Sequence, residues 1–210
     1  MKFIKEQFIM SASFIKRKLV KPFIAVCAVF LLFSVAVYLL MLAFPDMAKQ
    51  LFNAISEMFE SSGVLDENGN ISVILLFLSN ARAGFTGIVW GFMPFVFFPL
   101  FAVFINGAVM GITLGVYGVF SEVSPLALLA AGILPHGIFE LTAIFLCWAM
   151  GLGICLQLTG KIFGAKTDVS FSYYIKRCLG VYLFFVIPLL VAAAVVESYV
   201  TPVIMNLVIA

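Results

Sequence analysis

Long apolar runs separated by short polar segments make up most of this chain, whose mean hydropathy is +1.21. A helix needs about 20 mostly apolar residues to cross a bilayer. Five runs meet this requirement: 22–44, 71–92, 95–118, 125–158 and a run from 179 to 199 or beyond. The pattern predicts an all-α, polytopic transmembrane helix bundle of about five spans, with residues 1–210 forming a single membrane domain.

The fourth run is too long for one straight crossing. It covers about 34 residues and contains the sequence Pro135-His136-Gly137. Proline removes a backbone donor and its ring clashes with the preceding turn of a helix. We therefore expect the fourth span to be broken or strongly kinked at Pro135–Gly137.

Three polar segments flank the runs. Residues 1–21 mix lysine and arginine with apolar positions, which is typical of a basic helix lying at a membrane interface. Residues 45–70 carry apolar positions at helical spacing, so an amphipathic segment on the membrane surface is expected there. Residues 160–178 are predicted to form a polar loop.

The basic residues gather on one predicted side of the membrane. Six precede residue 22 and four lie within 160–178, whereas 45–70 and 119–124 together hold one lysine and six acids. Cytoplasmic flanks carry the excess of lysine and arginine. The N-terminus and the 160–178 loop are therefore predicted to be cytoplasmic, and 45–70 and the C-terminus extracytoplasmic, in a multi-pass protein of the cytoplasmic membrane.

Composition narrows the class of protein further. Hydrophobic residues make up 64% and charged residues 10%, against about 45–50% and 25% in soluble domains. A net charge of +2 gives no reason to expect a nucleic-acid partner. The four cysteines lie in or beside apolar runs, as buried reduced thiols do. The chain lacks the common catalytic motifs, so we expect neither an enzyme nor a cofactor.

Several polar side chains fall inside the predicted spans, where ionisable groups are costly and usually face a partner or a water-filled cavity. They are Asn80, Arg82, Asn106, His136, Glu140 and Glu197. His136 and Glu140 are four residues apart and therefore share a helix face. Pro135 and Gly137 belong to the same cluster, because a proline frees carbonyl groups in the turn before it.

The cluster has two interpretations. His136 and Glu140 can hydrogen-bond to each other, or to Asn80 and Arg82, and lock the bundle. Alternatively, the cluster carries a proton, an ion or a small solute. His136 and Glu140 are weak candidates for a metal site, because the chain has a single histidine and no second ligand cluster. Glu197, near the outer end of the fifth span, is expected to be an interfacial carboxylate.

Small residues recur at every fourth position on two spans. They are Gly107, Gly111 and Gly115 on the third span, and Ala83, Gly87 and Gly91 on the second. This spacing lets helices approach closely. We expect the two stripes to pack spans two and three together, with a homodimer interface as the alternative.

The run Leu134–Ala143, LPHGIFELTA, resembles the L-P-H-G-I-x-E-L-P-A pattern of the stage II sporulation protein M family, with Thr142 in place of the usual proline. Other family features follow in order. Asn80 opens a polar and small stretch through Gly87 and Gly91, Asn106-Gly107 is followed by Gly111, and Glu197 is followed by Pro202.

The resemblance implies a five-span membrane protein. In endospore-forming bacteria, members of this family anchor and recruit two peptidoglycan-degrading partners at the septal membrane. We therefore expect a non-enzymatic scaffold that holds membrane or extracytoplasmic proteins at the bilayer. The alternative is a small transporter or channel that uses the intramembrane polar cluster.

Overall fold

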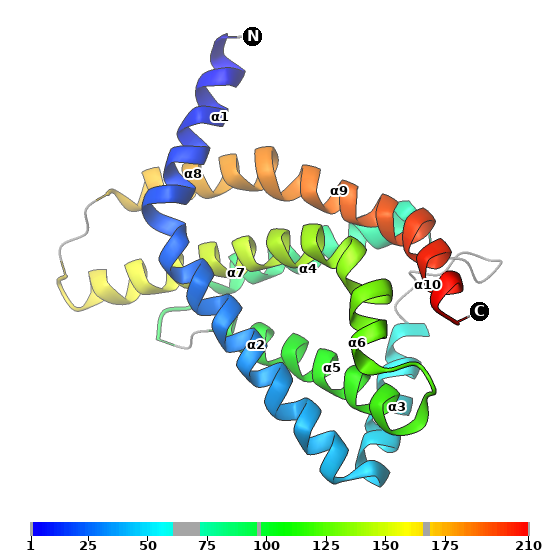
Figure 1. Ribbon diagram of the computed structural model, residues 1–210. Coiled ribbons are helices and arrows are strands. Elements are labelled where there is room, and N and C mark those ends of the chain that lie inside the picture. Colours follow the sequence, from blue (N-terminus) through cyan, green and yellow to red (C-terminus); the bar gives the residue numbers. More distant parts are fainter. Residues whose placement is uncertain (1, 61–71, 96–97, 166–168, 210) are drawn as a thin grey trace.

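The computed structural model describes residues 2–60, 72–95, 98–165 and 169–209, which contain helices and no strand (Figure 1). The α-helices are α1 (Lys2–Phe14), α2 (Val20–Ala43), α3 (Pro45–Glu60), α4 (Val73–Trp90), α5 (Phe98–Phe120), α6 (Pro125–Ala127), α7 (Leu134–Ile162), α8 (Phe171–Val181), α9 (Ile187–Val195) and α10 (Thr201–Ile209). Four π-helical segments join consecutive α-helices: η1 (Ile15–Leu19), η2 (Leu128–Ile133), η3 (Tyr182–Val186) and η4 (Val196–Val200).

Five continuous helices in the described part of the chain are long and apolar enough to cross a membrane. They are Lys2–Ala43, Val73–Trp90, Phe98–Phe120, Pro125–Ile162 and Phe171–Val208. The predicted all-α class and the number of spans are confirmed. The longest of the five has 42 residues, about 63 Å at 1.5 Å per residue, which is twice the hydrocarbon thickness of a bilayer.

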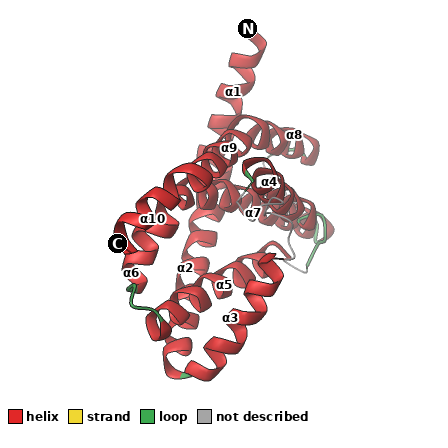
Figure 2. Cartoon of the chain, turned by 90° about the vertical axis from the view of Figure 1, so that its right-hand side faces the viewer, coloured by secondary structure: helices red, strands yellow, loops and turns green. Residues whose placement is uncertain are grey.

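Helix α7 forms the centre of the molecule. All ten residues of Ala143–Leu152 are buried, so α7 is covered on every side at this level. A helix that is apolar all round needs such an environment. Helices α2, α4, α5 and α9 pack against it, with α2, α3 and α5 on one side and α4, α8 and α9 on the other (Figures 1 and 2).

The glycine stripe on α5 packs against α2, which is the first span. A Cβ atom added at Gly111 would lie 2.6 Å from the backbone oxygen of Ser34 and 2.7 Å from Cβ of Val37. Gly107 and Gly115 meet the same helix at Phe30 and Met41.

The stripe on α4 packs against α7, which is the fourth span. Gly87 faces the ring of Trp148, and Gly91 lies against the backbone of Gly151. The prediction that the two stripes pack spans two and three together is therefore wrong, because each stripe has its close partner on a different helix. All five glycines are buried within the chain, so they are not available as a homodimer surface.

The π segments explain how the long helices bend. Each ends two or three positions before a proline, namely Pro22, Pro135, Pro188 or Pro202. In an α-helix a proline ring clashes with the carbonyl four residues earlier. At the last three prolines, the preceding residue donates its N–H to the carbonyl five residues earlier, so the helix is widened by one residue at the point of the clash.

This widening relocates the irregularity predicted in the fourth span. Pro135 and Gly137 lie in the first turn of α7, and the departure from α-helical geometry is in η2, just before them. Residues Pro125–Ile162 remain one helix, in which α6 and η2 run at a steep angle to α7 (Figure 1). The bend therefore lies in η2, directly before the predicted residues, and the backbone of the helix is not broken.

The N-terminal basic segment is continuous with the first span and packs against α8. Arg177 donates a hydrogen bond of 2.9 Å from Nη2 to Oε1 of Gln7, and the rings of Phe8 and Phe185 stack with centroids 5.0 Å apart. Segment 1–21 is therefore not a separate helix. Its position at the membrane interface stays a prediction.

The predicted polar loop over 160–178 is wrong in extent. Residues to Ile162 belong to α7, and α8 begins at Phe171 with Ser170 as its N-cap. Tyr174 and Cys178, four residues apart, are both buried, so the apolar face of α8 starts well before the apolar run of the sequence. The predicted amphipathic segment after the first span is present as α3, whereas residues 61–70 of that segment lie outside the described residues.

The topology can be tested by labelling single cysteines in a chain whose four native cysteines are replaced. Helices α3 and α10 lie at the opposite end of the molecule from the C-terminal end of α7 (Figure 1). Cysteines at the exposed positions Glu57 and Glu122 should react with an impermeant maleimide in intact cells. Cysteines at Lys5 and Lys161 should react only after permeabilisation. The opposite pattern would place the N-terminus outside.

Candidate intramembrane polar site

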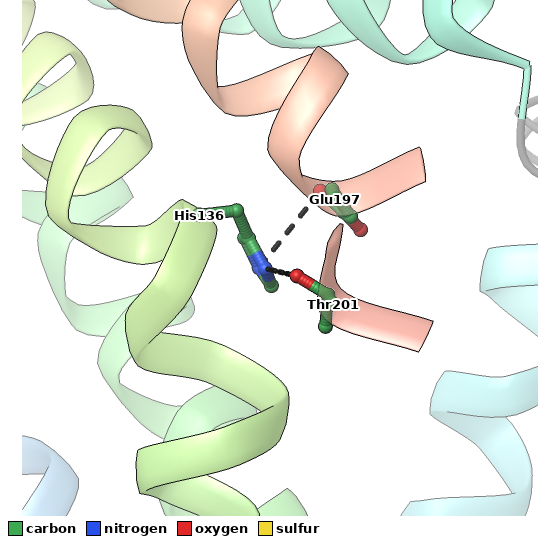
Figure 3. Close-up of polar contacts among 3 residues, drawn as sticks. All are labelled: His136, Glu197 and Thr201. Carbon is green, nitrogen blue, oxygen red and sulfur yellow. Dashed lines mark hydrogen bonds and ion pairs between the residues drawn. The ribbon is translucent and has the colours of Figure 1, made fainter. Parts of the chain in front are cut away.

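His136, at the start of α7, contacts the C-terminal part of the fifth long helix, Phe171–Val208. Its Nδ1 lies 3.2 Å from Oγ1 of Thr201, and its Nε2 lies 3.8 Å from Oε2 of Glu197 (Figure 3). The first contact has hydrogen-bond length, whereas the second is too long for a direct hydrogen bond. Each of the two long helices that contribute these residues has a π segment next to the contact. Segment η2 precedes His136 in the fourth helix, and η4 contains Glu197 in the fifth. The two proline-induced bends thus bring the polar groups together.

Glu140 completes the cluster from one turn further along α7. The ligand atoms of His136, Glu140 and Glu197 all lie within 4.8 Å of one another. The side chain of Asn80 on α4 lies close to the Glu140 carboxyl group, and both residues line the same cavity. Three of the five long helices therefore contribute to one polar centre, as expected for groups that avoid lipid.

A cavity of about 530 Å³ lies on the other side of Glu140, between α4, α5 and α7. Its polar lining comprises Ser79, Asn80, Arg82, Thr86, Asn106 and Glu140, and Trp148 and Trp90 are among its apolar walls. At about 30 Å³ per molecule, this volume holds more than ten waters. Arg82 and Asn106 are exposed at the surface of the protein, so the cavity is open to its surroundings.

The sequence-predicted residues fall into two groups around Glu140. His136, Glu140 and Glu197 form the close cluster, while Arg82 and Asn106 line the cavity and Asn80 touches both. Glu197 is 18% exposed and faces His136, and its expected place at the membrane interface stays a prediction. Asn106 also donates a hydrogen bond of 2.9 Å to the carbonyl of Ala102 within its own helix.

Thr201 was not among the predicted site residues. It is buried and orients the His136 ring. Its sequence signal is modest: it lies four residues after Glu197 and directly before Pro202. Helical spacing places Thr201 and Glu197 on one face, but the histidine that they share is 65 residues away from Thr201.

These features define a helical membrane protein built around an intramembrane polar centre. Comparison with known proteins then places the chain in a family. The model for the family described as stage II sporulation protein M matches residues 26–202, and the chain belongs to that family.

The chain is also similar to an uncharacterized protein of Methanocaldococcus jannaschii. The two are 32% identical over 133 residues, which is 63% of this chain and 67% of the relative. No solved structure matches the chain.

Proposed function

We propose that the chain is a small, non-enzymatic transport protein of the cytoplasmic membrane that carries a proton, an ion or a small solute past Glu140. The observation that supports this proposal is the cavity of about 530 Å³ that reaches Glu140. A residue that serves only to lock a bundle needs no such space. Intramembrane ionisable groups beside a water-sized cavity are typical of ion and proton pathways.

Glu140 occupies the position between the two halves of the proposed path. On one side lie the amides and the guanidinium of the cavity, and on the other lie His136 and Glu197. A cation or proton that enters the cavity therefore meets the Glu140 carboxylate before it meets the other two.

The proposal predicts that Glu140→Gln abolishes flux with little change in fold, because the amide keeps the shape of the side chain and removes its charge. The full-length chain is reconstituted in liposomes, and fluorescent indicators follow protons and small cations. We expect flux to fall at least about tenfold in Glu140→Gln. Glu57→Gln, which changes an exposed carboxylate on α3, is the matched control and should keep wild-type flux.

A second candidate function is the scaffold. Membership of the stage II sporulation protein M family favours it, and so does the exposure of Arg82 and Asn106 midway along α4 and α5. An arginine that faces lipid at this depth costs from about 3 to more than 10 kcal/mol, so a partner helix that covers it would be stabilising. Partner proteins of the membrane or of the extracytoplasmic space suit this candidate.

The liposome experiment separates the two candidates. Transport is overturned when wild-type liposomes leak no faster than empty ones, or when Glu140→Gln retains full flux. The scaffold is overturned when Glu140→Gln loses the flux and still recovers the same partner proteins from the membrane as the wild type.

A further inference from the structure

We propose that His136, Glu140 and Glu197 bind a divalent cation of the first-row transition metals. This inference deepens the proposed function by naming a class of cation for the same site. It concerns equilibrium binding, however, and is therefore tested separately from passage across the membrane.

The spacing of the three ligand atoms fits such an ion. Around a four-coordinate metal with bonds of about 2.0–2.2 Å, neighbouring ligand atoms lie roughly 3.4 Å apart. Nε2 of His136 and Oε2 of Glu197 are 3.8 Å apart, and the ligand atoms of all three residues lie within 4.8 Å of one another. Shifts of about 1 Å at the ends of two flexible glutamate side chains would complete the geometry.

The charges of the site favour a cation between the ligands. Two carboxyl groups within 4.8 Å of each other repel when both are ionised, and low-dielectric surroundings strengthen the repulsion. Among the described residues, Glu197 has His136 within 3.8 Å and no lysine or arginine at ion-pair distance. A divalent ion would neutralise both carboxylates at once.

Neighbouring polar side chains surround two of the ligands. In the tautomer with its proton on Nδ1, His136 donates to Oγ1 of Thr201 and presents the lone pair of Nε2 toward Glu197. The Glu140 carboxyl group has the amide of Asn80 beside it. Metal-binding histidines and carboxylates are commonly held in this way by a second layer of polar groups.

The ligand types narrow the choice of ion. An imidazole nitrogen favours Zn²⁺, Fe²⁺ or Ni²⁺ over Ca²⁺ and Mg²⁺, while two carboxylates also suit Mn²⁺. Three protein ligands leave at least one coordination position for water. An open position of this kind allows an ion to enter and to leave, whereas structural metal sites are usually closed by four ligands.

Equilibrium dialysis of the purified, full-length chain against Mn²⁺ and Zn²⁺ tests the inference, with Mg²⁺ and Ca²⁺ as competitors. We expect one saturable Mn²⁺ site per chain that Zn²⁺ displaces and Mg²⁺ does not. Mn²⁺ is the primary probe because carboxylates suit it and the thiolates of the four cysteines do not.

The variants His136→Gln, Glu140→Gln and Glu197→Gln should each weaken binding by at least about 100-fold, and Thr201→Val by roughly 10–100-fold. Glu57→Gln should leave it unchanged. Thermal unfolding of each variant without metal separates loss of ligands from loss of fold. Co²⁺ added to the wild type should give visible ligand-field bands that His136→Gln lacks.

The inference is overturned by the absence of saturable Mn²⁺ or Zn²⁺ binding in the wild type, or by wild-type affinity in a folded His136→Gln chain. Failure of the proposed transport function would give a different experimental outcome from failure of the metal inference. Proton flux that depends on Glu140 without metal binding removes only the metal, whereas metal binding without any flux removes only transport.

Discussion

Replacing Gly151 with alanine is expected to destabilise the protein strongly, although the change adds a single methyl group. A Cβ atom at Gly151 would overlap the backbone oxygen of Gly87 and would lie 3.0 Å from Cγ of Pro99. The obstructing oxygen belongs to the backbone of α4 and cannot rotate away as a side chain can. Helices α4 and α7 must therefore separate, and overpacking of this kind costs about 1–3 kcal/mol or more.

The measurement is thermal unfolding of the full-length chain in detergent, followed by size-exclusion fluorescence. Gly160→Ala, at the end of the same helix, is the matched control because its Cβ would meet Ala165 at an ordinary 3.5 Å. Gly160→Ala should unfold near the wild-type temperature and Gly151→Ala well below it. Equal stability of the two variants would show that α4 and α7 do not pack as closely as described.

The same contact shows what sequence spacing can and cannot predict about packing. The spacing of Gly87 and Gly91 predicts a close helix contact, and that contact exists. It does not identify the partner helix, which depends on where a matching small residue lies in three dimensions. Gly151 on α7 provides that match, in a buried stretch that also contains Leu146, Trp148 and Met150.

The long helices were predictable for a simple physical reason. Backbone polar groups inside lipid must be satisfied within a helix, so apolar length alone determines the number of spans. Lys176 and Arg177 made the start of the fifth helix appear to be loop, although Arg177 is buried against α1. A buried arginine with a partner 170 residues away leaves no local signal.

The polar centre was predictable in part. His136 and Glu140 are related by helical spacing, which depends only on local geometry. The contact of His136 with Glu197 and Thr201 depends on two bends, in η2 and in η4. Each bend precedes a proline in an apolar run, so the positions of the bends are present in the sequence. The directions of the bends are set by packing against α7 and cannot be read from the sequence.

Filling the cavity should stop transport without touching a charged group. Ala83 lines the cavity beside Arg82 and is exposed, so an indole in its place can enter the open space without displacing a buried neighbour. We expect flux through Ala83→Trp liposomes to fall at least about tenfold, because permeation is limited by the narrowest part of a path. Leu78→Trp is the matched control on the same helix, at a position 53% exposed and away from the cavity lining.

The Ala83→Trp variant distinguishes passage through the cavity from cation binding at His136, Glu140 and Glu197. Ala83 is not one of the three proposed metal ligands, so Ala83→Trp should keep its affinity for Mn²⁺ while losing flux. Loss of both would indicate that the indole distorts α4 and displaces Asn80 from Glu140. Wild-type flux in a folded Ala83→Trp chain would contradict passage through the cavity, even if Glu140→Gln is inactive. The steric and the electrostatic variants therefore test the same route by independent physical means.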